Sequence, residues 1–174
     1  DKFVVAVDGT QSVAVNGATF NQVISVVAGE GDDDVQYNSD NWTIQGTEET
    51  SIEGIAFENI ESINKFNSDG DSDRHLIGTT GQDVLKIEGA NNTISSNGIT
   101  YYGIGSVDAL GETDTVSGSS TWDLLASGFE AFDIRFTSVE VADSGSNGTL
   151  NGTINTDKFV VAVDGTQSVA VNGA

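Results

Sequence analysis

The sequence lacks cysteine, proline and methionine, and it has few cationic side chains. Without cysteine there are no disulfides, thiolate metal ligands or cysteine nucleophiles. Without proline every residue keeps a backbone N–H, which suits strands that pair on both sides. Six Lys and Arg stand against 27 Asp and Glu, and the net charge of −21 excludes a surface for nucleic acid or anionic lipid. No initiating methionine, basic n-region or long apolar run is present, so we expect part of a mature protein with no signal peptide or membrane span.

One segment of the sequence occurs twice. DKFVVAVDGTQSVAVNGA at residues 1–18 recurs without change at residues 157–174, which gives a period of 156 residues. The chain therefore reads as a single repeat-array segment, with one period at 1–156 and the first 18 residues of the next at 157–174. Neighbouring repeats of the same protein are the expected partners. Matching first and last segments also predict self-association end to end.

A shorter repeat lies within the period, and an aromatic residue followed three positions later by an aliphatic one marks it. Four units of about 39 residues result. Each unit continues into an acidic or glycine-rich turn and then into apolar residues that alternate with polar ones, the period of half-buried strands. The marker pairs are Phe20/Val23, Phe57/Ile60, Tyr101/Ile104 and Phe136/Val139, and the later apolar strands begin at Val35, Leu76, Val116 and Leu150.

A unit this short cannot bury a core alone and must stack on its neighbours. We therefore predict an all-β fold, a right-handed parallel β-solenoid (β-helix) of stacked short strands. The four aromatic residues and the four aliphatic residues of the marker pairs should then form two axial ladders. Residues Phe57 to Ile63 are expected to form a strand, a corner and a strand, with a short helical turn as the alternative. The competing fold is an antiparallel β-sandwich extender domain, disfavoured because the unit is short and does not read as a hairpin meander.

Acidic residues cluster in the turns and raise the question of calcium. The segment from Ala28 to Val35 comes close to the glycine- and aspartate-rich nonapeptide whose turns hold Ca²⁺ in parallel β-rolls. Ca²⁺ prefers six to eight oxygen ligands, which converging carboxylates supply. The alternative is that these are solvated turns that keep a long fibre soluble. The candidate Ca²⁺ ligands are Asp32, Asp33, Asp34, Asp69, Asp71, Asp73 and Asp114.

Catalytic patterns are scarce. His75 is the only histidine, which excludes imidazole metal clusters, and we expect it at the surface beside Arg74. The pairs Asp33/Asp34 and Asp71/Asp73 could serve a polysaccharide-active β-helix enzyme, but a tandem unit would have to repeat its active site. The prediction is therefore that the chain is not an enzyme. A second alternative is a glycan- or surface-binding repeat module, with Trp42, Tyr101, Tyr102 and Trp122 as its contacts.

Three blocks resemble the repeats of giant bacterial surface and secreted proteins, the haemagglutinin-like and RTX-type adhesins. They are Gly54 to Ile63, Gly78 to Leu85 and Gly111 to Val116. The resemblance implies an extracellular location, secreted or at the bacterial cell surface, and a stalk that often responds to calcium. Tandem nonapeptides are missing, which departs from a regular calcium β-roll. The expected function is a structural stalk or extender repeat of an extracellular adhesin or fibre.

Overall fold

In a computed structural model the chain is described at residues 1–6, 10–37, 41–46, 49–52, 54–64, 74–89, 92–155, 159–161 and 169–171, and the regular structure there is all β. The predicted strand, corner and strand from Phe57 to Ile63 is confirmed, since β8 (Ile55–Glu58) and β9 (Ser62–Asn64) are joined by a short corner. No helix in these ranges is long and apolar enough to cross a membrane.

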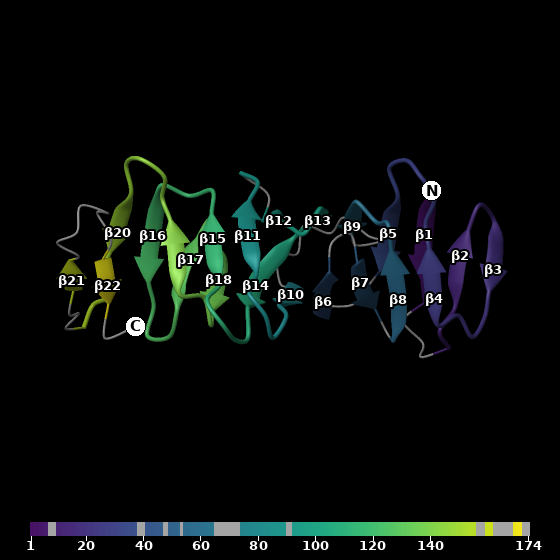
Figure 1. The fold of residues 1–174 in the computed structure, drawn as a ribbon, viewed down its shortest axis with the longest axis horizontal. Coiled ribbons are helices and arrows are strands. Elements are labelled where there is room, and N and C mark those ends of the chain that lie inside the picture. Colours follow the sequence, from purple (N-terminus) through teal and green to yellow (C-terminus); the bar gives the residue numbers. More distant parts are fainter. Residues whose placement is uncertain are drawn as a thin grey trace.

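Five strands make up each unit, and four units follow one another along a rod (Figure 1). The first unit holds β1 (Lys2–Val5), β2 (Val13–Val15), β3 (Ala18–Phe20), β4 (Ser25–Val27) and β5 (Asp34–Tyr37). The second holds β6 (Asn41–Gly46), β7 (Glu49–Ile52), β8 (Ile55–Glu58), β9 (Ser62–Asn64) and β10 (Arg74–Ile77). The third holds β11 (Val84–Ile87), β12 (Ile94–Ser96), β13 (Ile99–Tyr101), β14 (Ile104–Asp108) and β15 (Thr115–Ser117). The fourth holds β16 (Thr121–Leu124), β17 (Phe129–Ala131), β18 (Ile134–Thr137), β19 (Val141–Asp143) and β20 (Thr149–Asn151).

Two ten-stranded sheets form the walls of the rod. Sheet 1 has the order β19-β15-β11-β12-β13-β9-β5-β1-β2-β3, and sheet 2 has the order β20-β16-β17-β18-β14-β10-β6-β7-β8-β4. Strands from successive coils pair in parallel, as in β1 with β5 and β5 with β9. The protein is therefore a β-solenoid of about four turns, and the β-sandwich alternative is wrong.

Consecutive units place their first three strands on opposite sheets. In each unit the first three strands lie in one sheet, the fourth crosses to the other sheet and the fifth returns. The next unit then begins on the other sheet, so two units restore the starting face. The predicted axial ladders are wrong for this reason. Phe57 lies in sheet 2 beside Val26 and Thr50, while Tyr101 lies in sheet 1 beside Ile63 and Ile94.

The first three strands of each unit form an antiparallel meander, which corrects the expectation that the unit contains none. Its second turn has two residues, both with positive φ where both are described: Asn16 and Gly17 at 50° and 80°, Asn97 and Gly98 at 51° and 88°. Asn-Gly is the strongest short-range signal for such a type I′ hairpin, because these residues tolerate left-handed backbone. The sequence therefore did carry this signal.

Inward-facing residues of the two sheets form one core. Phe57, Tyr101 and Phe136 are fully buried, as are Ile60 and Ile104, while Val23 and Val139 pack at its margin. In sheet 1 the inward residues Phe3, Val35 and Ile63 stand in register on neighbouring strands. Ten strands at a spacing of about 4.8 Å give the rod a length of about 45 Å.

The second copy of the repeated segment forms the same hairpin as the first. In β21 (Phe159–Val161) and β22 (Val169–Val171), Phe159 pairs with Val171 and Val161 with Val169. These are the pairs Phe3 with Val15 and Val5 with Val13 of β1 and β2, displaced by 156 residues. The hairpin stands as a separate two-stranded sheet beyond β20 (Figure 1).

Candidate functional site: carboxylate ladders at the coil corners

Acidic residues stand immediately before six strands of sheet 1. Asp1, Asp33, Asp83 and Asp114 precede β1, β5, β11 and β15, and Glu61 and Glu140 precede β9 and β19. Of these, Asp33, Asp83 and Asp114 are buried although each follows a glycine-rich turn. Since neighbouring strands start at the same edge of the sheet, these carboxylates stack along the rod axis.

Asp114 and Glu140 each accept a backbone hydrogen bond from the coil before them, whereas Asp83 accepts one from the Thr79 N–H of its own turn at 2.7 Å. The Asp83 N–H donates to Asp114 Oδ1 at 2.7 Å, and the Asp114 N–H donates to Glu140 Oε2 at 2.9 Å. We call Asp83, Asp114 and Glu140 the long ladder. Such charge-assisted bonds satisfy N–H groups that leave the sheet at the corner.

A second set repeats this geometry two units earlier. The Asp33 N–H donates to Glu61 Oε2 at 2.6 Å, and the N-terminal ammonium of Asp1 pairs with Asp33 Oδ1. We call Asp1, Asp33 and Glu61 the short ladder. Two occurrences of one bonding pattern, displaced by two units, indicate a structural device of the repeat.

Burial gives Asp114 the most perturbed environment in the long ladder. Desolvation raises the pKa of Asp114 above its usual range, the hydrogen bond from the Asp83 backbone opposes that rise, and repulsion from Asp83, Glu140 and Glu112 adds to it. Asp114 Oδ2 and Asp33 Oδ2 are buried with no hydrogen-bond partner. The long ladder thus holds the Asp114 carboxylate in a place where its neutralisation is favourable.

The predicted calcium ligands do not gather in one place. Asp33 and Asp114 belong to different ladders, Asp32 is exposed, and Asp34 accepts a hydrogen bond from Ser62 Oγ at 2.8 Å. Asp69, Asp71 and Asp73 lie outside the described residues. Over the described ranges, no group of three or more Asp, Glu, His or Cys side chains could hold a metal ion.

Four ladder members were not among the predicted site residues: Asp1, Glu61, Asp83 and Glu140. They do not sit in acidic runs, and charge clustering was the only signal used. A better signal was available, because each carboxylate lies directly before an apolar strand. The strand alternation alone would have placed these residues at one edge of sheet 1.

Other candidate residues have structural contacts. His75 is half-buried and its Nδ1 lies 2.9 Å from Ser106 Oγ, while Arg74 is buried with its guanidinium donating to the Tyr102 carbonyl. Of the aromatic residues proposed as glycan contacts, Tyr101 and Trp122 are buried, so that part of the prediction is wrong. Tyr102 is partly exposed, and the side chain of Trp42 lies outside the described set.

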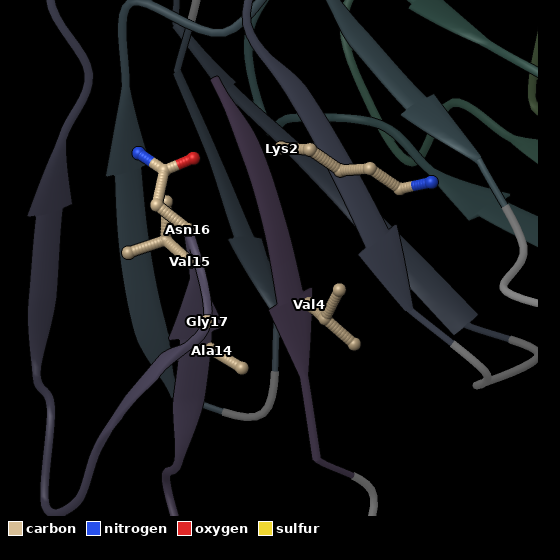
Figure 2. A pocket seen from close by; sticks show the side chains of 6 residues that line it. All are labelled: Lys2, Val4, Ala14, Val15, Asn16 and Gly17. Atoms are coloured by element: carbon tan, nitrogen blue, oxygen red, sulfur yellow. The ribbon is translucent and has the colours of Figure 1, made fainter.

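A shallow depression of about 330 Å³ lies against the β1–β2 hairpin (Figure 2). Its lining residues are Lys2, Val4, Ala14, Val15, Asn16 and Gly17. The lining contains one cation and one amide, with no carboxylate, hydroxyl or imidazole. Apart from the Lys2 amine, this set offers no nucleophile, and it offers no acid–base pair.

The fold and the ladders define the protein as a β-solenoid whose corners are tied by buried carboxylates. Comparison with protein families, with characterised proteins and with solved structures found no match. Inference about function therefore depends on the repeat geometry itself.

Proposed function

We propose that the chain is a structural stalk or extender repeat of a bacterial extracellular adhesin or fibre, with further repeats of the same protein as its neighbours. The supporting observation is that the sequence period is also a structural period. After four five-strand units the chain forms β21–β22, a separate two-stranded sheet that repeats the pairing of β1–β2 in the same register. A unit that can be added indefinitely along one axis suits a spacer.

Length and charge fit this role. One period adds ten strands to each sheet, so every further period extends the rod by about 48 Å. Residues 157–174 carry a charge of −1, so the period 1–156 carries −20. A rod of uniform negative charge stays soluble and resists lateral association.

Small-angle scattering of a protein with two consecutive periods tests the proposal. The single chain is the control. We expect the longest dimension to grow by about 48 Å while the cross-sectional radius of gyration stays unchanged. A thicker cross-section, or a scattering profile of two beads on a flexible tether, would contradict a continuous stalk.

Calcium stabilisation is a separate part of the proposal. It is supported by the net charge of −21 and by the unpartnered oxygens of Asp33 and Asp114. Millimolar Ca²⁺ is expected to raise the melting temperature more than Na⁺ of matched ionic strength, measured after EDTA treatment. Equal shifts would mean that the ions only screen the charge.

A further inference from the structure

The outer face of sheet 1 carries a continuous row of polar side chains in the middle of the rod. The row crosses six neighbouring strands, β5, β9, β13, β12, β11 and β15 (Figure 1). Side chains alternate between the two faces of each strand, and strand pairing sets one outward residue of each strand opposite that of the next. In order along the rod they are Asp34, Ser62, Thr100, Ser95, Lys86 and Ser117. We call them the polar row, and the spacing of paired strands makes it about 24 Å long.

The polar row is electrically balanced, although the chain is strongly acidic. Its formal charges are those of Asp34 and Lys86, which cancel, whereas the whole chain carries −21. Between these two residues the row presents hydroxyl groups on consecutive strands, from Ser62, Thr100 and Ser95. A surface with many hydrogen-bonding groups and no net charge complements a neutral ligand that is itself rich in hydroxyl groups.

Two of the three central hydroxyl groups are held in place by carboxylates. Ser62 Oγ donates to Asp34 Oδ1 at 2.8 Å, and Ser95 Oγ donates to Glu88 Oε1 at 2.7 Å. Thr100 stands between the two serines, and its hydroxyl has no hydrogen-bond partner among the residues that the structure describes. The serine oxygens therefore keep oriented acceptor lone pairs, while Thr100 can both donate to a ligand and accept from it.

An exposed aromatic ring stands beside the polar row. Tyr102 directly follows β13 on the same face as Thr100, two residues and about 7 Å away. Its side chain is 39% exposed, whereas the other tyrosine and tryptophan side chains that the structure describes are buried. The Tyr102 N–H donates to the Ile63 carbonyl at 3.2 Å, and the Tyr102 carbonyl accepts from the buried Arg74 guanidinium. The ring therefore projects from a fixed backbone, which lowers the entropy cost of binding.

The outer face of sheet 2 does not offer comparable groups. Its central outward residues bond to one another across strands, with Arg135 Nε 3.3 Å from Glu130 Oε2 and His75 Nδ1 2.9 Å from Ser106 Oγ. These pairs use the polar groups of that face within the sheet. The combination of an unpaired hydroxyl, oriented acceptors and an exposed ring belongs to sheet 1.

We propose that the outer face of sheet 1 binds a neutral polysaccharide chain, which lies along the polar row with one sugar ring stacked on Tyr102. Sugar hydroxyl groups both donate and accept, as the hydroxyl groups of the row do. The C–H face of a sugar ring is apolar and matches the flat face of a tyrosine ring. This inference goes beyond the proposed function, because a stalk needs no ligand.

Other classes of ligand match this face less well. An acidic polysaccharide would be repelled by the net charge of −21. A protein interface buries an apolar centre, and the polar row supplies none. In a stalk of many periods the face would recur once in each period, so weak single sites would add up to strong attachment. That last consequence rests on the proposed function, whereas the single site does not.

Isothermal titration calorimetry of the full chain tests the ligand class. The probes are four neutral hexasaccharides, cellohexaose, laminarihexaose, mannohexaose and maltohexaose, with the acidic hexagalacturonate as the comparison. We expect at least one neutral probe to bind with a Kd of about 1 mM or lower, and hexagalacturonate to bind at least about tenfold more weakly. The proposal is overturned if none of the neutral probes binds at about 5 mM, or if hexagalacturonate binds as tightly as the best of them.

A matched pair of aromatic substitutions tests the stacking contact with the best neutral probe. Tyr102→Ala should weaken binding at least about tenfold. Phe132→Ala is the control, since Phe132 is 49% exposed in the β17–β18 turn of sheet 2. Tyr102→Phe keeps the ring and should keep the affinity within about threefold. Equal affinities of Tyr102→Ala and Phe132→Ala would rule out the proposed face.

A second pair of substitutions tests the polar row. Thr100→Val removes the hydroxyl and keeps the shape of the side chain, and it should weaken binding by about three- to tenfold. Thr121→Val is the control, because Thr121 is an exposed residue at the start of β16 in sheet 2. Thermal melting shows whether each variant keeps the native fold. If both threonine variants bound like the native chain, the ligand would not lie along the polar row.

This inference and the stalk fail independently. A two-period protein that scatters as a continuous rod, combined with no binding of the neutral probes, would refute the ligand face and leave the stalk intact. A two-period protein that folds back on itself would refute the stalk whatever the titrations show.

Discussion

Replacement of Phe136 and of Phe20 by alanine should have very different effects, although both residues hold the same position in their units. Phe136 is fully buried in the fourth unit. Its ring stacks on Phe129 with centroids 5.5 Å apart and meets Trp122 edge-on at 6.3 Å. Phe20 lies at the N-terminal end of the rod with 52% of its surface exposed.

The expected magnitudes follow from burial. Removal of a buried phenylalanine costs about 3–5 kcal/mol, from lost transfer free energy and from the cavity left behind. Phe20 has already lost about half of that burial and its site can relax into solvent, so Phe20→Ala should cost about 1 kcal/mol or less. At about 2–4 °C per kcal/mol for a chain of this size, Phe136→Ala should lower the melting temperature by about 6–20 °C.

Urea denaturation followed by circular dichroism measures both variants, at dilute concentrations where copies do not associate. The native chain supplies the reference free energy of unfolding and the reference urea slope. If Phe20→Ala destabilised the protein as much as Phe136→Ala, the N-terminal end would be covered by some part of the chain, and the alternating-sheet arrangement would be refuted. Small effects of both substitutions would refute the packed core.

The long ladder and the tight turns allow two more tests. Asp114→Asn should raise the melting temperature at pH 7, because the raised pKa of Asp114 means that its charged form destabilises the fold. The gain in melting temperature should vanish as the pH falls through the raised pKa toward the ordinary Asp value. Calorimetry across this pH window measures the effect, and a variant that is less stable than the native chain at neutral pH would contradict the prediction. Gly128→Ala should destabilise the protein more than Gly17→Ala. Both glycines have positive φ, but a Cβ at Gly128 would collide with the Phe136 carbonyl, whereas a Cβ at Gly17 would meet open space. Equal urea midpoints for the two variants would show that the backbone contact at Gly128 is absent.

Local signals predicted much of the fold. Alternation of apolar and polar residues predicted strands, and the pair Phe3/Val5 and the predicted strand start Val35 are buried in β1 and β5. The aromatic repeat predicted that Phe57, Tyr101 and Phe136 are core residues, which is confirmed. These features depend on residues two to four positions apart in sequence, because the period of side-chain alternation and the preferences of turn residues are set over that distance.

The ladders and the sites could not be predicted in this way. Asp33 and Asp114 look like solvated or calcium-binding residues when only their acidic turns are considered. Each is held by a hydrogen bond to a distant residue: the Asp33 N–H donates to Glu61 Oε2, and Asp114 Oδ1 accepts from the Asp83 N–H, partners that lie 28 and 31 residues away in sequence. Contacts over that distance are set by the stacking of coils, and a single sequence does not show which coils stack.

The sequence by itself determined the 156-residue period, the four units and the inward-facing residues, because repetition and alternation are properties of the chain. Only the tertiary structure decided which sheet each unit occupies. From the start of one unit to the start of the next, the chain changes sheet an odd number of times. Each unit therefore begins on the sheet opposite to the one before it, and equivalent residues of consecutive units lie in opposite walls.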